Sequence, residues 1–497
     1  MSGIGPALSQ RLAAEAAITR TGPRICAIGD SITANCNFTA TPGVGAVVSS
    51  GELMTVTVTH DGLVGSPFYM VNAAQEEYNG VYTMGANTVN GTIANVVFPG
   101  STTSPATGTP VIYMPHKSTS ADFLAYCVGL AGGALTRGLP LGWPGKVSSF
   151  IRNKMSLIYQ DSPDICLIVA GVNDVATYVT GPTLITSTVN TAYANIIAMA
   201  DDLIVKGVLP VICTITPIDN TRPGWNVSQQ HAILKLNKLL REYCAGKRSV
   251  LLCDVYAVLV DPTSTTGNTK LNHTSDGLHW SGLGAWAVAT ELYNVLNARG
   301  LVSARPKILP MSTAESYGIN SACLQINDNP LGTAQVGVVT APATGTAWTG
   351  WTLSVLGTAA VAGSSPARAD GFGTDQSIAI TSQADNDGAL FTGTNIAGRL
   401  VAGQKIFGVM EVSTAAVTAL KELRFRLSIV AGGVPANCEA GYPSASIFMV
   451  GDKTYLLVTP VMYIPATANV QPIFSAKFNG SGGATIKVGR VGIYILG

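Results

Sequence analysis

Charged residues are scarce in this sequence, and their scarcity limits the possible partners. Asp, Glu, Lys and Arg make up 11% of the 497 residues, and the net charge at pH 7 is +1. The Lys and Arg residues form no run, whereas recognition of nucleic-acid phosphates normally needs a basic patch. We therefore expect no nucleic-acid partner.

Long apolar runs are also missing. The opening stretch, MSGIGPALSQRLAAEAAITR, does not combine a basic start with a continuous apolar segment, so the pattern of a secretory signal is absent. No stretch approaches the roughly 18 apolar residues that would span a bilayer. We expect no membrane insertion, and a protein that is made in the cytoplasm of a host cell and leaves it by another route.

The sequence offers no pattern for a nucleotide or metal site. Neither GxGxxG nor GxxxxGKS/T follows an apolar run. His273, Asp276 and His279 lie close together, but their spacing is not that of a helical HxxxH pair, and no second Cys or His cluster accompanies them. We expect no cofactor and no metal.

The cysteines do not suggest a disulfide framework. Nine of them are scattered along the chain, an odd number. Several lie in apolar, strand-like runs, namely Cys26, Cys166, Cys213 and Cys253. This placement predicts buried free thiols.

Apolar runs and amphipathic segments alternate in the first part of the chain. Four runs are typical of buried parallel strands, at residues 24–28, 165–170, 208–215 and 250–255. Three segments have apolar residues at helical spacing and end before a glycine, at residues 188–206, 229–244 and 282–298. The alternation predicts a doubly wound α/β domain.

Two regions depart from this alternation. Residues 41–116 are rich in Gly, Thr and Val, with alternating runs such as LMTVTVTH and Asn-Gly turns, and they indicate an inserted small β-domain. From residue 302 onward nearly all segments are β-patterned, and only STAAVTALKEL fits a helical turn or a long connection. The sequence thus predicts an α/β domain at residues 1–40 and 117–301, the insert at 41–116, and a C-terminal β-sandwich at 302–497.

Polar residues follow the predicted strands. Asp30 and Ser31 come directly after the first run, Asn173 follows the second, and Asp276 and His279 precede the last helical segment. Ligands of an open α/β sheet bind beyond the carboxyl ends of its strands. We therefore expect these side chains to converge at one edge of the sheet.

This set of motifs resembles the GDSL family of serine hydrolases, in its SGNH branch. Three short blocks carry the resemblance: GDSI, with Ile32 where the family usually has Leu, GVND at residues 171–174, and DGLH at residues 276–279. The resemblance implies a flavodoxin-like, three-layer α/β/α domain. Each block is weak alone, but the three occur in family order.

The block-two glycine of that family is harder to place. Gly145 precedes an expected helix at residues 147–157 and is our choice for this position. Gly142 is an alternative in the same segment, and Gly132 or Gly133 are alternatives further back. The Asn that often accompanies this glycine is absent, so the alternatives stay open.

The resemblance assigns a mechanism to these residues. Ser31 is the expected nucleophile, His279 takes its proton, and Asp276 orients the imidazole and stabilises its charged form. The backbone N–H groups of Ser31 and Gly145 and the side-chain amide of Asn173 would form the oxyanion hole. One such donor lowers the barrier by roughly 3 kcal/mol.

Structural roles compete with these assignments. Ser31 fits an ordinary turn or helix cap, Asn173 fits an Asx turn, and Asp276 with His279 fits the cap of the following helix. All three structural explanations would have to hold together, in family order, so we favour the catalytic one.

Three further residues are candidates for substrate contact. Trp143 and Trp280 lie in segments near the expected site, where their rings would stack on sugars, although ordinary partial burial explains them equally well. His273 fits a loop residue at the rim of the site or a substrate contact.

The other regions suggest a substrate by resemblance. The pattern LVAGQKIFGVMEVS resembles carbohydrate-binding jelly rolls, and the insert, with EEYNGVYTM and SPATGTPVIY, resembles small β-modules of phage tail and baseplate proteins. Together they imply a homotrimeric tailspike or tail-fibre protein on the virion tail, which removes O-acetyl groups from a bacterial capsule or O-antigen. An inactive receptor-binding tail protein and a general small-ester or lipid esterase remain alternatives.

Overall fold

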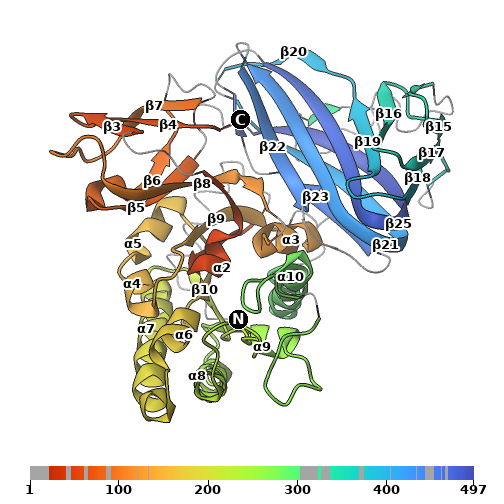
Figure 1. Cartoon of the computed structure of the whole chain (residues 1–497). Coiled ribbons are helices and arrows are strands. Elements are labelled where there is room, and N and C mark those ends of the chain that lie inside the picture. Colours follow the sequence, from red (N-terminus) through yellow and green to blue (C-terminus); the bar gives the residue numbers. More distant parts are fainter. Residues whose placement is uncertain are drawn as a thin grey trace. The chain divides into compact units, whose positions relative to one another are not determined.

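The computed structural model divides the chain into two units (Figure 1). The α/β unit comprises Met1–Cys36 and Ala121–Arg305, and the β unit comprises Asn37–Ser120 and Pro306–Gly497. The insert and the C-terminal region therefore fall in the same unit, and the three-domain boundaries stay a prediction. The structure describes residues 22–40, 46–60, 65, 67–85, 91–119, 121–131, 134–271, 273–302, 323–325, 336–368, 374–402, 404–431, 434–442, 453–459, 462–464 and 468–496.

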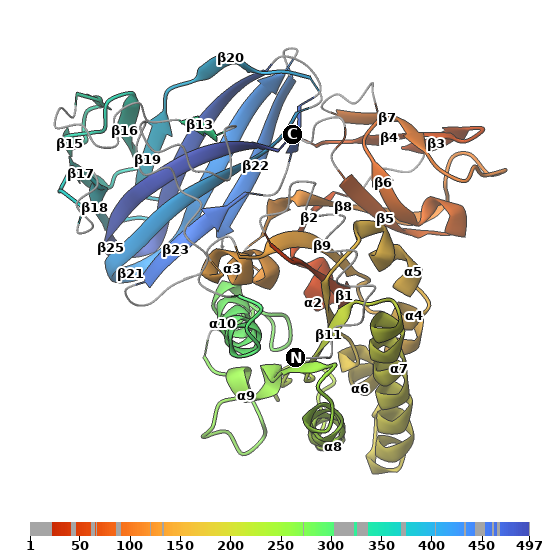
Figure 2. The same cartoon turned by 180° about the vertical axis from the view of Figure 1, so that it is seen from behind.

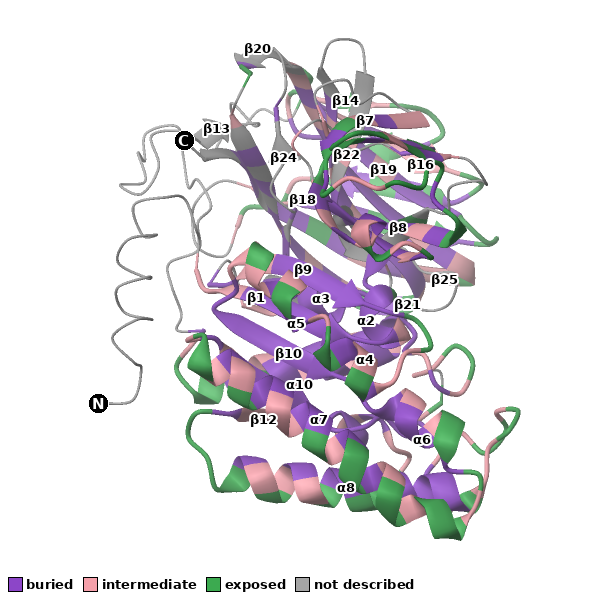
Figure 3. Ribbon diagram, turned by 90° about the vertical axis from the view of Figure 1, so that its left-hand side faces the viewer, coloured by how far each residue is buried: buried purple, intermediate pink, exposed green. Residues whose placement is uncertain are grey.

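A five-stranded parallel sheet forms the centre of the α/β unit. Its strands, in spatial order, are β12 (Leu251–Cys253), β11 (Leu209–Cys213), β10 (Ile165–Val169), β1 (Arg24–Gly29) and β9 (Thr136–Gly142). Every residue of β10 is buried, as are all but the first of β1. Burial on both faces explains why these strands are continuous apolar runs (Figure 3).

The edge strand β9 is not among the four strands predicted from apolar runs. Its sequence, TRGLPLG, contains Pro140, which cannot donate a ladder hydrogen bond and is tolerated at the edge of a sheet. Gly138 approaches β1 so closely that a Cβ would lie 2.4 Å from the Cys26 sulfur. Proline is compatible with the edge of the sheet, and glycine allows the close packing. Because both residues interrupt the apolar pattern, the sequence does not predict this strand.

Helices cover both faces of this sheet (Figures 1 and 2). The three predicted helices correspond to α7 (Ile185–Val205), α8 (Val227–Ala245) and α10 (Gly282–Ala298). α7 packs with α4 and α8 on one face, and α10 packs with α3 and α9 on the other. The shorter helices are α2 (Ser31–Ala34), α3 (Phe123–Leu130), α4 (Ser148–Arg152), α5 (Met155–Ile158), α6 (Val172–Tyr178) and α9 (Val255–Leu259). The single helix expected at residues 147–157 is thus two short ones.

The strand order changes direction beside β1. Numbered along the chain, the order from one edge to the other is 2-1-3-4-5, as in flavodoxin-like folds. β1 has its chain successor β9 on one side and β10 on the other, so the connections leave in opposite directions there. Ligands of such sheets bind outside the carboxyl ends of the strands at this switch point.

The β unit begins with seven strands, of which β2 precedes the predicted insert. β2, β8, β5 and β6 pair antiparallel, and β3, β4 and β7 form a separate three-stranded sheet. Buried apolar side chains of both groups, such as Met54, Phe68, Tyr78 and Ile93, share one core. The bounds are β2 (Asn37–Ala40), β3 (Val47–Ser50), β4 (Leu53–Val58), β5 (Pro67–Ala73), β6 (Gly80–Thr83), β7 (Gly91–Val97) and β8 (Gly108–Ser118).

The C-terminal region is β-rich, as predicted, and its assignment as a jelly-roll sandwich stays a prediction. Two long strands, β21 (Lys405–Ala431) and β25 (Ala468–Leu496), pair antiparallel over most of their lengths. The other described strands are β13 (Cys323–Gln325), β14 (Val338–Val339), β15 (Thr344–Gly345), β16 (Trp351–Leu356), β17 (Ala360–Ser364), β18 (Gln376–Ser382), β19 (Gly388–Gly393), β20 (Ile396–Leu400), β22 (Val434–Tyr442), β23 (Lys453–Val458) and β24 (Met462–Tyr463).

The segment STAAVTALKEL is part of β21 and not a helical turn or a connection. Ala416 and Ala419 have positive φ values of 52° and 56°, and the register against β25 shifts at both places. Irregular positions of this kind bend a strand locally while pairing continues on either side. The alanine-rich composition that suggested a helix therefore accompanies two bulges.

Two expectations about the whole chain can be checked against the described residues. The seven cysteines whose side chains the structure describes are free and buried, including the four predicted to be so. Within the part of the chain that the structure describes, no helix is long and apolar enough to cross a membrane.

A buried carboxyl group lies where β1 meets α2. Asp30 is 1% exposed, and its Oδ1 accepts a hydrogen bond from the N–H of Ile32, which caps α2. Its Oδ2 has no hydrogen-bond partner in the structure, and the residue lines a cavity of about 10 Å³. Burial raises the pKa of Asp30 to about 7, and the nearby negative charge of Asp174 acts in the same direction.

We expect Asp30→Asn to change how stability depends on pH. The folded protein keeps the Asp30 proton up to about pH 7, whereas the unfolded chain releases it near pH 3.8. The contribution of Asp30 to the free energy of unfolding is therefore present at low pH. It is lost as the pH rises through the pKa of Asp30 in the folded state. Between about pH 4.5 and pH 8 the free energy of unfolding should fall by about 3 kcal/mol more in the wild type than in the variant.

Urea unfolding of both proteins at the two pH values measures this difference. Asn keeps the oxygen that caps α2, so the comparison isolates the ionisation. An identical pH dependence in the two proteins would show that Asp30 titrates normally in the folded state.

Candidate active site

Ser31 occupies the carboxyl end of the central strand. It is the first residue of α2 and follows β1 through Gly29 and Asp30. A Cβ on Gly29 would lie 2.3 Å from the carbonyl oxygen of Val169 on β10, so only glycine allows this close approach of the strands. The tight turn leaves the Ser31 side chain half-buried at the edge of the sheet, and not in its interior.

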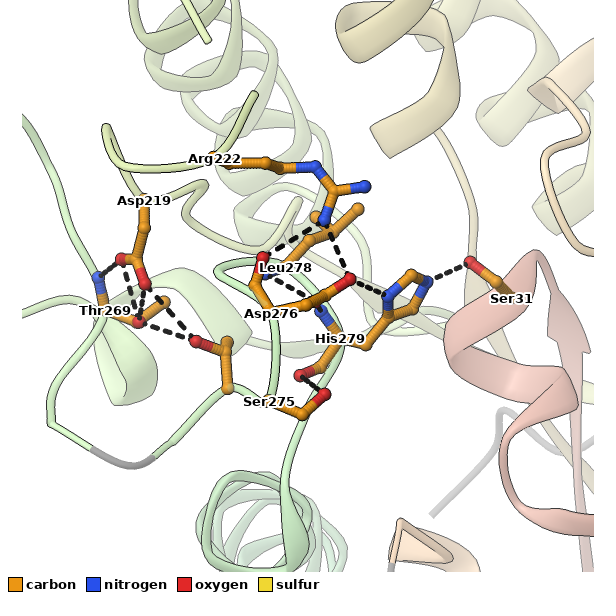
Figure 4. Close-up of polar contacts among 9 residues, drawn as sticks. Ser31, Asp219, Arg222, Thr269, Ser275, Asp276, Leu278 and His279 are labelled. Carbon is orange, nitrogen blue, oxygen red and sulfur yellow. Dashed lines mark hydrogen bonds and ion pairs between the residues drawn. The ribbon is translucent and has the colours of Figure 1, made fainter. Parts of the chain in front are cut away.

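The His279 imidazole connects Ser31 with Asp276, although Ser31 is 248 residues away in the sequence. Nε2 of His279 lies 2.8 Å from Oγ of Ser31, and Nδ1 lies 2.8 Å from Oδ2 of Asp276. Figure 4 shows the three side chains in one line. The structure therefore brings together the three residues that the sequence motifs singled out.

The charge of Asp276 fixes the tautomer of the imidazole. Burial acts to raise the pKa of Asp276, but hydrogen bonds from the backbone and ring of His279 outweigh it and hold this pKa well below its ordinary value. An ionised carboxylate only accepts hydrogen bonds, so Nδ1 of His279 donates to Asp276. In the neutral imidazole Nε2 then carries no proton and accepts from the Ser31 hydroxyl. This is the arrangement that a general base for a serine requires.

The loop that carries both residues is held by its own backbone. Oδ1 of Asp276 accepts from the N–H groups of Leu278 at 3.1 Å and His279 at 2.8 Å. Gly277 between them has a φ of +79°, in the left-handed region that favours glycine. Its carbonyl accepts from the N–H of Asp219 at 2.9 Å. The spacing of Asp276 and His279 thus lets one turn fix both side chains.

One residue at this site was missed by the sequence analysis. Nη1 of Arg222 donates to Oδ2 of Asp276 at 3.0 Å and reaches the Asp276 carbonyl oxygen at 3.4 Å. Arg222 lies in the segment between β11 and α8, in no recognisable motif. The only available signal was that this segment also follows the carboxyl end of a strand.

Asn173 lies beside the segment that follows β9. It is the second residue of α6, and its Nδ2 donates to the carbonyl oxygen of Lys146 at 3.0 Å. The neighbouring Asp174 carboxylate accepts from the N–H and the hydroxyl of Ser148 at 2.8 and 2.7 Å. These bonds fasten the start of α4 to the start of α6. They place Asn173 next to the predicted oxyanion segment.

The glycine candidates differ in their surroundings. Gly145 is exposed with a φ of +72°, and a Cβ there would meet no atom within 4 Å. Gly142 ends β9, and a Cβ there would lie 2.1 Å from the backbone N of Ala34, so its role is close packing against α2. Gly132 and Gly133 lie outside the described residues. Gly145, adjacent to the Lys146 carbonyl that contacts Asn173, stays our prediction for the backbone donor.

The predicted stacking of sugars on two tryptophans is contradicted by their burial. Trp143 is 2% exposed and Trp280 4% exposed. The Trp143 ring meets Phe150 edge-on, the Trp280 ring meets Phe123 edge-on, and the indole N–H of Trp280 donates to the Thr216 hydroxyl. Both rings belong to the hydrophobic core. Although each tryptophan lies close to a loop in the sequence, burial of its large aromatic surface is favourable, and the side chain turns inward.

His273 remains a candidate at the rim. Its Nδ1 lies 3.0 Å from the carbonyl oxygen of Leu271, and its own carbonyl accepts from the N–H of Ser281. A substrate contact by this residue stays a prediction. The described part of the chain contains no group of three or more His, Cys, Asp or Glu side chains arranged to hold a metal ion.

Several solved structures are similar to this chain. A GDSL-like lipase from Bacteroides thetaiotaomicron is 19% identical over 34% of this chain and 77% of that one, with a TM-score of 0.28. A lipase/acylhydrolase from Enterococcus faecalis is 15% identical over 56% and 96%, with a TM-score of 0.31. A catalytic mutant of an acetylxylan esterase from Geobacillus stearothermophilus is 12% identical over 56% and 95%, with a TM-score of 0.32. Because these TM-scores are low, we base no conclusion on them.

The comparison with protein-family models gives a match over a longer part of the chain. No curated protein matches the sequence. The family model of GDSL-like lipases and acylhydrolases matches residues 25–292, which is more than half of the chain and includes Ser31, Asn173, Asp276 and His279. The protein therefore belongs to the GDSL-like lipase/acylhydrolase family.

Proposed function

We propose that this acylhydrolase is a serine esterase with Ser31, His279 and Asp276 as its catalytic triad. The observation that carries the proposal is the continuous chain from Ser31 Oγ through the imidazole to an ionised carboxylate, with 2.8 Å at each step. A serine hydroxyl is a weak nucleophile at neutral pH and needs an adjacent base. His279 supplies that base, and Asp276 orients it.

The residues define each step of the reaction. Ser31 Oγ attacks the ester carbonyl while its proton moves to Nε2 of His279, and Asp276 stabilises the imidazolium that forms. The tetrahedral intermediate collapses, and the alcohol leaves with the proton from Nε2. A water molecule, deprotonated by the same nitrogen, then attacks the acyl-serine and releases the carboxylic acid, which restores Ser31.

Three donors are assigned to the developing oxyanion. The N–H of Ser31 lies in the first turn of α2 and has no partner within the helix. The N–H of Gly145 belongs to an exposed turn. Asn173 has two N–H groups on Nδ2, so it can keep its bond to Lys146 and still face the oxyanion.

We further propose that the substrate is an O-acetylated bacterial surface polysaccharide, a capsule or an O-antigen. The segment that contacts Asp276 and Gly277 contributes Asp219 and Arg222, so this side of the site is polar. A hydrophilic sugar fits such surroundings better than a long acyl chain does. The β-rich C-terminal region, whose pattern resembles carbohydrate-binding jelly rolls, supports the same substrate.

The biological setting is proposed on resemblance alone. The insert at residues 41–116 resembles small β-modules of phage tail and baseplate proteins. On this basis we propose a homotrimeric tailspike or tail-fibre protein on the virion tail, attached to other tail proteins. Alternatives are an inactive receptor-binding tail protein and a general esterase for small esters or lipids.

We expect Ser31→Ala to abolish hydrolysis. Removal of the nucleophile should lower kcat for 4-nitrophenyl acetate at least 10³-fold and stop the release of acetate from O-acetylated capsule or O-antigen. Acetate is measured enzymatically, with Tyr178→Ala, an exposed change at the end of α6, as the control for folding.

The two substrates separate the alternatives. Activity of the wild type on the small ester alone would retain the esterase and overturn the polysaccharide assignment. No activity on either substrate, together with retained binding to the polysaccharide, would favour the inactive receptor-binding protein.

We expect Asn173→Ala to lower kcat without a comparable change in KM. Loss of one oxyanion donor should reduce kcat about 10²- to 10³-fold, because the donor acts mainly on the transition state. Steady-state kinetics with 4-nitrophenyl acetate measures both constants. A decrease of less than about tenfold would mean that the Asn173 amide only positions Lys146 and does not face the oxyanion.

A further inference from the structure

We propose that Arg222 is a positioning residue for the reaction, which holds the Asp276 carboxylate on His279 and sets the pH at which His279 becomes an effective base. The inference rests on the proposed esterase function and assigns a fourth member to its charge network. Arg222 lies on a different segment from Asp276 and His279, between β11 and α8.

The guanidinium and the imidazole share one carboxylate oxygen. Oδ2 of Asp276 accepts from Nδ1 of His279 at 2.8 Å and from Nη1 of Arg222 at 3.0 Å. Oδ1 accepts the two backbone N–H groups of the same loop. Both oxygens are therefore held, and the carboxylate cannot rotate without losing a charged hydrogen bond. In Figure 4 the Arg222 guanidinium lies above Asp276, whereas His279 and Ser31 lie to its right.

Arg222 is itself held by the segment that carries it. Its N–H donates to the carbonyl of Asp219 at 3.0 Å, and its carbonyl accepts from the N–H of Trp225 at 3.1 Å. The N–H of Asp219 donates in turn to Gly277, inside the loop that contains Asp276. Backbone and side chain thus contact this loop together. Because the backbone of Arg222 is held in this way, its guanidinium extends toward Asp276 from a defined position.

The value of this ion pair lies in its effect on the triad. The side chains of Arg222 and Asp276 are 27% and 46% exposed, and pairs this exposed contribute little to folding stability. However, the Arg222 charge offsets part of the negative charge that Asp276 presents to the imidazole. A weaker negative charge stabilises imidazolium less, so the Arg222 charge favours the neutral form of the ring. Hydrolysis is thereby extended toward acid conditions.

The other titratable groups around the pair are already engaged or lie elsewhere. The Asp219 carboxylate accepts hydrogen bonds from Thr269 and Thr274. Asp30 is buried next to Ser31, and the His273 ring contacts the Leu271 carbonyl. On the side of Asn173, the Lys146 ammonium lies over the Phe150 ring. Among the described residues, the titratable side chains in direct contact with the Asp276 carboxylate are His279 and Arg222.

Two variants separate the charge of Arg222 from its hydrogen bond. Arg222→Gln keeps a donor and removes the charge, whereas Arg222→Lys keeps the charge. Lys238→Ala is the control, because Lys238 forms an exposed ion pair with Glu242 on the surface of α8. The measurement is kcat/KM for 4-nitrophenyl acetate as a function of pH, together with an NMR titration of the His279 ring in the full chain.

We expect the acid limb of the profile in Arg222→Gln to move upward by about half a pH unit, with a smaller shift in Arg222→Lys and none in the control. The midpoint of the ring titration should move in the same direction. An unmoved limb and midpoint in Arg222→Gln would overturn the proposal, whatever happens to the plateau. Equal shifts in the Gln and Lys variants would also overturn it, because they would show that charge is not the cause.

The two proposals fail in different ways. A wild type without esterase activity would contradict the proposed function. The ring titration does not depend on turnover, so it would still test whether Arg222 acts on His279. The His279 resonance is identified by its loss in His279→Gln.

Discussion

The burial of the parallel sheet on both faces is the constraint on which the site depends. Apart from Arg24 at the start of β1, the side chains of β1 and β10 are apolar and buried, so functional groups are restricted to the strand ends. Ser31, Asn173 and Arg222 all lie in segments that follow a strand. The loop with Asp276 and His279 precedes α10 and contacts Ser31 and Arg222 (Figure 4). Residues from distant parts of the sequence thus meet at this edge of the sheet, because polar side chains are in contact with solvent at the strand ends and not within the buried strands.

The same region contains carboxyl groups whose pKa values are shifted in opposite directions. Burial raises the pKa values of Asp30 and Asp174, which stabilise the starts of α2 and α4. Asp276 is more exposed, and hydrogen bonds from its own loop and from His279 keep its pKa low despite the burial of part of the group. The environment therefore separates carboxyl groups that shape the site from the one that remains charged beside the imidazole.

Much of this site could be predicted because it consists of short local motifs. Ser31, Asn173, Asp276 and His279 each sit in a block of a few residues, and the structure brings Ser31, His279 and Asp276 into contact. Arg222 could not be predicted, because its partner is 54 residues away and neither neighbourhood has a pattern that demands an arginine.

The fold was predicted to a similar extent. Four strands were visible because two-sided burial produces apolar runs, whereas β9 was hidden by the proline and glycines that suit an edge. Trp143 and Trp280 were misplaced because a position near a loop says little about which way a large side chain turns. In STAAVTALKEL the local preference for a helix gave way to long-range pairing with β25.

The central claim is that Ser31 is a nucleophile activated by His279. The most direct test is incubation with a fluorophosphonate, followed by intact mass measurement and peptide mapping. The account predicts a single covalent adduct on the peptide that contains Ser31, and much slower labelling in His279→Gln. No adduct, or an adduct on another residue, would contradict it.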